Sequence, residues 1–153
     1  MRYRRRDPNN PVLMRAIAQY LDGISDYDEA LEEVHELLQV APDWFMAHNQ
    51  AGYIKHETRP EETKEHYEKV VSLRPDHYIG YYNLACVYAL ANEFDKAIEY
   101  LETIVDRDDL TESYRIHGWN MDKDSDFDEL KKSDKHAKRF AEIAGILNAG
   151  RGA

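Results

Sequence analysis

The chain has 153 residues, 42% of them hydrophobic and 33% charged, and a formal net charge of −10. This balance suits a single globular core and argues against nucleic-acid binding, which needs clustered lysine and arginine to neutralise phosphates. No apolar run approaches the roughly 20 residues that span a bilayer, and no signal-peptide pattern follows the N-terminus. We therefore expect no nucleic-acid partner, no membrane span and a cytoplasmic location, with which the single Cys86 agrees.

Residues 1–9 form a basic N-terminal arm that contains Arg2, Arg4, Arg5 and Arg6. Chain ends of this kind are usually solvated and frayed. The alternative is that the arginines contact an acidic partner or a membrane surface.

From residue 10 onward, residues that favour helix starts recur every 33 or 34 positions. Short polar side chains accept hydrogen bonds from the unpaired N–H groups of a first helical turn. One series predicts the starts of first helices, at Asn10, Asp43, Asp76 and Asp109. The other predicts the starts of second helices, at Ser25, Thr58, Asn92 and Ser125. Two helices per period indicate stacked helical hairpins.

Small side chains obey the same period. At one site of the first helix they are Ala18, Ala51 and Ala85. At one site of the second helix they are Ala30, Thr63 and Ala97. Small residues let neighbouring helices approach closely, so we expect these positions to be buried. Pro42 and Pro75 then mark the turns out of two second helices, because proline has no N–H to donate.

The stretch "YYNLACVYALANEFDKAIEYLETI" contains Tyr81, Leu84, Ala85, Tyr88 and Ala97 in an order that resembles the tetratricopeptide repeat family. The resemblance covers residues 10–108, with repeats at about 11–43, 44–77 and 78–108. It implies an all-α fold, an α-α superhelix or tetratricopeptide solenoid of three repeats. In the second repeat Gln50 and Thr63 replace the expected Leu and Ala.

Residues 109–148 predict a degenerate fourth repeat and a C-terminal capping helix. The text "DSDFDELKK" is similar to the terminal segment of many bacterial tetratricopeptide proteins. We expect the last helix to begin near Ser133, because an apolar face then recurs at helical spacing, formed by Phe140, Ile143, Ala144 and Leu147. Residues 149–153 are expected to be a flexible tail.

The sequence offers no catalytic pattern. The run of alternate aspartates from Asp122 to Asp128 has the spacing of a calcium loop, but Phe127 and Ser133 stand where that loop needs glycine and glutamate. An acidic linker whose members cap short helices explains the run better. The seven histidines have no metal-binding spacing along the chain. We therefore predict no enzyme activity, no metal and no cofactor.

The family resemblance implies that first helices line an extended concave groove. Its register places these candidate groove residues on the outward side: Arg15, Gln19, His48, Asn49, Lys55, Tyr82, Asn83 and Cys86. Such side chains suit a carboxylate or the backbone of an extended peptide. We predict a non-catalytic adaptor or scaffold that binds a protein or peptide. For each residue, ordinary helix surface or packing between repeats is the alternative.

Two other roles stay open. The first helix, "PVLMRAIAQYL", is apolar nearly all round, so a second copy of the chain can cover it in a self-assembling, homo-oligomeric scaffold. The other alternative is a regulatory subunit or chaperone of a larger complex.

Overall fold

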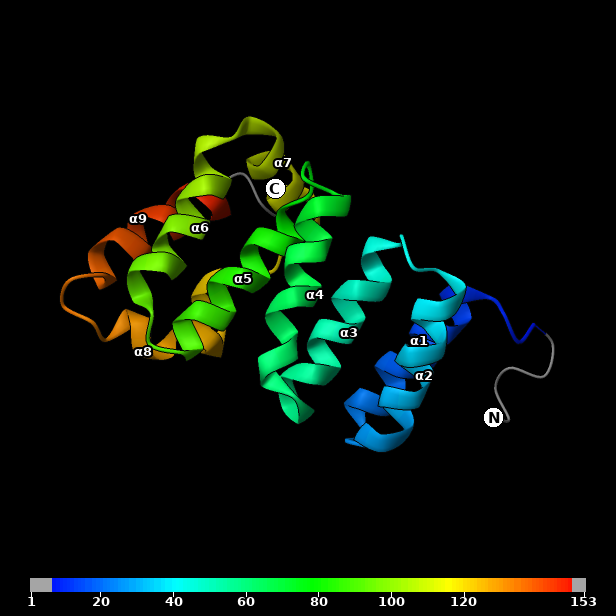
Figure 1. The fold of residues 1–153 in the computed structure, drawn as a ribbon. Helices are drawn as coiled ribbons and strands as arrows, with labels where there is room; N and C mark the ends of the chain where they lie inside the picture. The colour runs from blue at the N-terminus through cyan, green and yellow to red at the C-terminus, as the bar shows by residue number, and fades with distance from the viewer. Residues whose placement is uncertain (1–6, 150–153) are drawn as a thin grey trace. The chain divides into compact units, whose positions relative to one another are not determined.

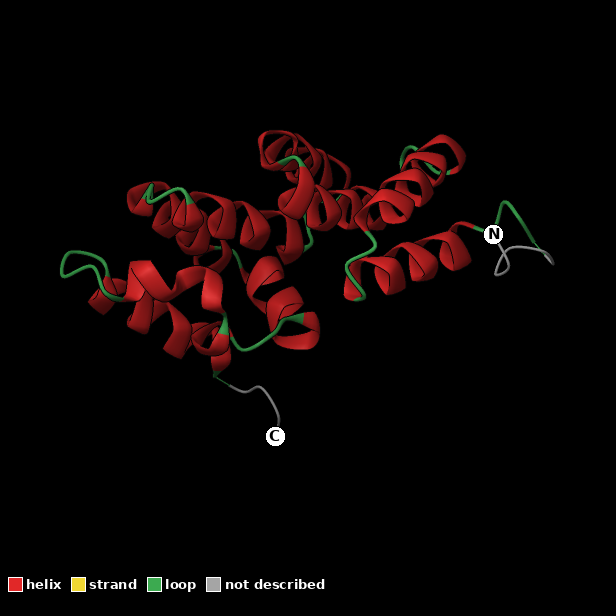
Figure 2. Ribbon diagram, turned by 90° about the horizontal axis from the view of Figure 1, so that it is seen from below, coloured by secondary structure: helices red, strands yellow, loops and turns green. Residues whose placement is uncertain are grey.

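The computed structural model describes residues 7–149, apart from the side chain of Glu57, and this part consists of helices and loops without strands (Figures 1 and 2). Most of the predicted basic arm and of the predicted tail lies outside the described residues. The chain divides into two compact units, which we call unit 1, Met1–Leu73, and unit 2, Arg74–Ala153. Each unit is described by itself.

Unit 1 consists of two helical hairpins. Its helices are α1 (Pro11–Gly23), α2 (Tyr27–Val40), α3 (Phe45–Thr58) and α4 (Pro60–Leu73). Helix α1 packs on α2, α3 packs on α4, and α3 also contacts α1 and α2. The two hairpins therefore stack through α3.

Helix α1 begins as the sequence predicts. The side chain of Asn10 accepts hydrogen bonds from the backbone N–H groups of Val12 at 3.0 Å and Leu13 at 3.1 Å. Pro11 occupies the first turn, where its missing N–H costs nothing. The predicted capping role of Asn10 is confirmed.

The other three predicted starts of first helices are wrong by one or two residues. Helix α3 follows Trp44, α5 (Tyr78–Leu90) follows His77, and α7 (Asp108–His117) follows Arg107. Two of the aspartates bind arginine instead: Asp76 pairs with Arg74 at 2.8 Å, and Asp109 pairs with Arg107. An arginine two residues earlier thus competes with the helix start for the carboxylate.

The starts predicted for second helices also need correction. Ser25 and Asn92 both have a φ of 59°, a left-handed conformation that turns the chain between helices. Thr58 is the last residue of α3, where its hydroxyl donates to the Ile54 carbonyl at 3.1 Å. In the α3–α4 hairpin one residue, Arg59, joins the helices, so this turn has no place for a left-handed residue.

The core of unit 1 forms where α1, α2 and α3 meet. Its buried apolar residues are Met14, Ala18, Leu21, Ala30, Val34, Leu37, Ala47, Ala51 and Ile54. The small residues predicted to be interior are buried in both units, Thr63 included. Burial of these sites lets the helix backbones approach, as the repeat period predicts.

Unit 2 begins with the hairpin of α5 and α6 (Phe94–Asp106), after which α7 packs on both. The chain continues through two short 3-10 helices, η2 (Met121–Lys123) and η3 (Ser125–Phe127), into α8 (Asp128–Lys131) and α9 (Ala137–Asn148). Helix α9 lies against α6, α7 and α8. Its apolar face is buried as predicted, at Phe140, Ile143, Ala144 and Leu147.

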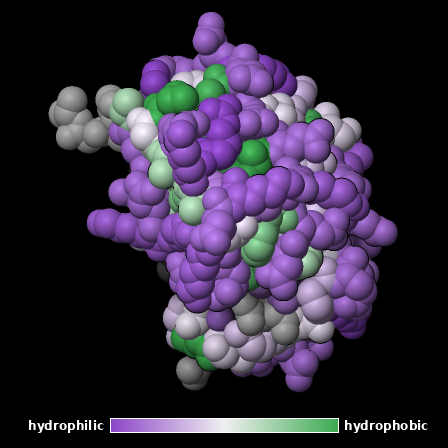
Figure 3. Space-filling model, turned by 90° about the vertical axis from the view of Figure 1, so that its left-hand side faces the viewer, coloured by the Kyte–Doolittle hydropathy of each residue, from purple (hydrophilic) through white to green (hydrophobic). Residues whose placement is uncertain are grey.

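The last helix begins at Ala137, later than the predicted Ser133. The Ser133 carbonyl accepts from the N–H groups of His136 and Ala137, so residues 133–136 form a turn. The face shown in Figure 3 is mainly hydrophilic, with hydrophobic side chains in a few separate patches. Within residues 7–149, no helix combines the length and apolar character that crossing a bilayer requires.

Candidate functional site

The candidate residues fall into both units. Arg15 and Gln19 lie on α1, and His48, Asn49 and Lys55 lie on α3, all in unit 1. Tyr82, Asn83 and Cys86 lie on α5 in unit 2. The structure therefore gives two local arrangements.

In unit 1 the candidates differ in exposure. Gln19 is exposed and Arg15 is half-buried, whereas Asn49 is only 5% exposed. Lys55 forms an ion pair with Glu62 of α4. The hydrogen bond from Lys55 is the largest cause of the lowered pKa of Glu62. Asn49 is thus the one buried member of this set, and solvent reaches Arg15, Gln19, His48 and Lys55.

His48 meets His66 of α4. The Nδ1 atoms of the two rings are 3.3 Å apart, and His48 Nε2 lies 2.7 Å from the carbonyl oxygen of Pro42. Because a carbonyl only accepts, Nε2 of His48 carries a proton, and in the tautomer with this one proton Nδ1 is an acceptor. With that tautomer of His48, the donor to its Nδ1 is the Nδ1–H of His66. Desolvation, followed by the charges of Lys55 and His48, lowers the pKa of His66 to about 4.

Two of the depressions on the described surface of unit 1 lie near its first helices. One, of about 400 Å³, is apolar and lies along α1, lined by Leu13, Ala16, Ile17 and Tyr20. The other, of about 280 Å³, lies between α2 and the end of α3, lined by Leu31, Glu32, Val34, His35, Leu38, Lys55 and Arg59. Of the candidate residues, Lys55 alone borders one of these two depressions.

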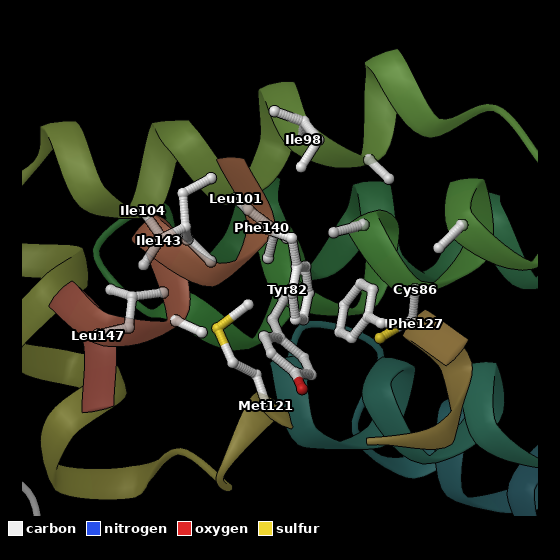
Figure 4. Close-up of a cluster of buried hydrophobic side chains, with 14 of the residues drawn as sticks. Tyr82, Cys86, Ile98, Leu101, Ile104, Met121, Phe127, Phe140, Ile143 and Leu147 are labelled. Atoms are coloured by element: carbon white, nitrogen blue, oxygen red, sulfur yellow. The ribbon is translucent and has the colours of Figure 1, made fainter. Parts of the chain in front are cut away.

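In unit 2 the outward side of α5 is covered by the chain itself. We call residues Met121–Leu130 the latch segment; η3 and α8, which carry most of it, pack on α5. Tyr82, Asn83 and Cys86 are 5%, 4% and 7% exposed. The Tyr82 hydroxyl donates to the Asp124 carboxylate at 2.7 Å. The rings of Tyr82 and Phe127 pack edge to face. Figure 4 shows Tyr82, Cys86 and Phe127 grouped in this cluster.

The latch segment is held by its own polar and apolar groups. Asp124 accepts from the Asp126 N–H at 3.0 Å and so caps η3, as predicted for an alternate aspartate. The helix η2 is capped by Asn120 instead, and α8 has no side-chain cap. Met121, Phe127 and Leu130 are fully buried. Tyr114 supports the entry to the segment, because its hydroxyl accepts from the Met121 N–H at 3.1 Å.

Cys86, Asp124 and Asp126 place a sulfur and two carboxylates within 4.8 Å of one another. Burial raises the pKa of the Cys86 thiol well above its ordinary value, and the charges of the two aspartates raise it further. The thiol is therefore protonated at neutral pH and is a poor nucleophile. Burial likewise raises the pKa of Tyr82, so its hydroxyl stays a donor. This cluster is a hydrogen-bonded contact that holds the latch segment on α5.

The partners that complete these arrangements are not among the residues predicted from the sequence. Glu62 and His66 are four residues apart on one face of α4, a spacing visible in the sequence. The apolar residues of the latch segment were also visible, but nothing local indicated that they would cover α5.

The comparisons with known proteins agree with this architecture. A tetratricopeptide repeat family model matches residues 56–115. No curated protein sequence matches the chain. The predicted fold class, an all-α solenoid of the tetratricopeptide type, is confirmed.

Solved structures of MamA have a similar fold. A crystal structure of MamA aligns with a TM-score of 0.64 at 17% identity, over 94% of this chain and 80% of MamA. The 41-end form of MamA from Desulfovibrio magneticus RS-1 gives 0.62 at 22% identity, over 96% and 81%. The MamA RS-1 ArsTM double mutant gives 0.62 at 20% identity, over 98% and 82%.

Proposed function

We propose that this chain, which carries tetratricopeptide repeats, is a non-catalytic protein-interaction scaffold. The repeats support this coarse role, and none of the comparisons indicates an enzyme family. The finer proposal is that the first helices of unit 1 bind an extended, carboxylate-bearing segment of another polypeptide. A cytoplasmic location stays a prediction.

The latch segment on α5 carries the finer proposal. There an acidic segment with short 3-10 turns lies on the outward side of a first helix, held by a tyrosine-to-carboxylate hydrogen bond and by the Phe127 ring. It is an intramolecular example of a first helix that binds a polypeptide segment. Equivalent sites of unit 1 are candidates for the same mode of binding in trans.

The repeat period identifies those equivalent sites. Tyr82 corresponds to His48 and Arg15, at intervals of 34 and 33 residues. Cys86 corresponds to Gly52 and Gln19 at the same intervals. Unit 1 thus has the guanidinium of Arg15 at the position where α5 has the phenol of Tyr82. Lys55 adds an ammonium group near the end of α3. Cationic donors bind carboxylates more strongly than neutral donors, so the preferred segment is acidic.

A labelled peptide with the sequence of residues 119–131 tests the proposal in trans. We expect the full chain to bind it, and the double variant Arg15→Ala, Lys55→Ala to bind it at least about 100-fold more weakly, since each of the two charged hydrogen bonds contributes about 1.5–3 kcal/mol. Fluorescence anisotropy measures the affinity. The control is Lys64→Ala, Lys69→Ala, which removes two cations from α4 and should leave binding unchanged. Absence of binding, or equal losses in both double variants, would contradict the proposal.

A second candidate function is self-assembly through α1. The apolar depression along α1 and its exposed neighbours support it: Val12 is 66% exposed, while Tyr20 and Ile24 are each 55% exposed. Large apolar side chains gathered on one surface usually mark an interface. We propose that a second copy of the chain covers this apolar surface of α1.

Ala16→Arg tests this second candidate, because residue 16 is exposed within the depression. We expect the mass of the wild type in sedimentation equilibrium to rise with concentration, and that of Ala16→Arg to stay at one chain. Ala141→Arg places the same charge on an exposed position of α9 and should behave as wild type. A wild-type mass of one chain at every concentration removes self-assembly.

A further inference from the structure

Unit 1 brings together two histidines that the sequence separates. His48 on α3 and His66 on α4 are 18 residues apart in the chain, and their Nδ1 atoms are 3.3 Å apart. The ring centroids lie 5.6 Å apart with an interplanar angle of 37°, so the rings do not stack face to face. Two ring nitrogens therefore face one another across the α3–α4 hairpin.

This separation is the one expected of two ligands on a single metal ion. Zinc binds histidine nitrogen at about 2.0–2.1 Å in tetrahedral geometry, which places two such nitrogens about 3.3–3.4 Å apart. In the structure the two Nδ1 atoms form a hydrogen bond with each other. The distance between the two nitrogens fits an ion that lies beside the line joining them, and each ring turns toward the ion when it binds.

The other nitrogen of His48 has the partner that metal-binding histidines usually have. His48 Nε2–H donates to the Pro42 carbonyl at 2.7 Å. A bond of this kind fixes the tautomer and the ring orientation and makes the opposite nitrogen a better ligand. The proton on Nε2 leaves the Nδ1 lone pair of His48 directed at His66.

The surroundings also allow an ion to enter. Both rings are half-buried and border solvent, so water can complete the coordination. Glu62 lies one turn before His66 on α4, and its carboxylate offsets the charge of Lys55. Imidazole ligands select zinc, copper and nickel over magnesium and calcium.

We propose that His48 and His66 form a binding site for a divalent transition-metal ion, with zinc as the probe. A bound ion joins α3 to α4, and through the Pro42 carbonyl it also fixes the turn between α2 and α3. The site acts on unit 1 as a clip across its second hairpin. It does not depend on the proposed binding of a polypeptide.

Titration of the full chain with zinc chloride in a calorimeter tests the site. We expect one zinc ion to bind to the wild type. His48→Gln or His66→Gln should weaken zinc binding by at least about 10- to 100-fold, which is the usual cost of losing a residue that only supports a metal ligand. Circular dichroism checks that each variant is folded.

A second histidine pair is the matched control. His77 and His117 of unit 2 stack with centroids 5.4 Å apart, but His77 Nδ1 accepts from the Ile79 N–H at 3.2 Å and cannot bind an ion at the same time. The double variant His77→Gln, His117→Gln should bind zinc as wild type does. Binding that survives both His48→Gln and His66→Gln, or that the control pair abolishes, would overturn the proposal.

Thermal unfolding gives an independent measurement, because a ligand that binds the folded state alone raises the melting temperature with its concentration. Trp44 belongs to unit 1, and Trp119 belongs to unit 2. With Trp119→Phe as background, zinc should raise the melting temperature reported by Trp44 and should fail to do so after His66→Gln. If zinc raised the melting temperature equally with and without His66→Gln, the result would count against the site.

Discussion

Replacing Phe127 by alanine should lower the free energy of unfolding of unit 2 by about 3–5 kcal/mol, the usual cost of truncating a buried phenylalanine. Phe127 is fully buried, and its ring contacts Tyr82 and Phe140 at centroid distances of 5.7 and 5.2 Å. The variant loses these contacts and leaves a cavity between α5 and α9. Urea unfolding followed by Trp119 fluorescence, with Trp44→Phe as background, measures the change.

Ile116→Ala is the control for this experiment. Ile116 is also in unit 2, but it is 64% exposed, so its truncation should change the free energy of unfolding by less than about 0.5 kcal/mol. If Phe127→Ala cost no more than Ile116→Ala, the latch segment would not be part of the unit 2 core.

The second large effect is expected at Gly52 in α3. A Cβ atom there would lie 2.7 Å from Cζ of Tyr67, whose ring is 4% exposed and cannot move away freely. Gly52→Ala should therefore destabilise unit 1 by up to about 2 kcal/mol, because overpacking costs about 1–3 kcal/mol and helix propensity returns only about 1 kcal/mol. Urea unfolding followed by Trp44 fluorescence, with Trp119→Phe as background, measures the result.

Gly145→Ala separates helix propensity from overpacking. Gly145 lies within α9, and a Cβ there meets no atom within 4 Å, so this variant should stabilise unit 2 by about 1 kcal/mol. Introducing Gly52→Ala on a Tyr67→Ala background should remove the penalty, since the two side chains then no longer collide. A penalty that persists without the Tyr67 ring would show a different cause.

Much of the fold was predictable because it depends on a repeated local pattern. Ala18, Ala51 and Ala85 recur with the period, and all three are fully buried. The exact helix starts were not predictable in this way. Asp76 is a good helix cap by type, but Arg74 two residues earlier binds its carboxylate, and the helix starts after His77. Neighbouring side chains compete for the same polar group, and residue type alone does not decide that competition.

The candidate site was predictable only as a set of positions on first helices. The register places Tyr82 on the outward side of α5, yet the latch segment covers it through Asp124, 42 residues away. In the same way His48 meets His66, which lies on a different helix. A repeat pattern gives the direction of a side chain but does not identify the segment that later packs on it.

The sequence by itself determined the helical hairpins, their period, the small interior positions and the apolar face of the last helix. These follow from side-chain size and polarity at fixed spacings, which are local properties. Only the tertiary structure decided that the latch segment fills the outward side of α5 and that two histidines meet in unit 1. The reason is physical: these contacts join residues on different elements, so they arise only when the packed helices bring the segments together.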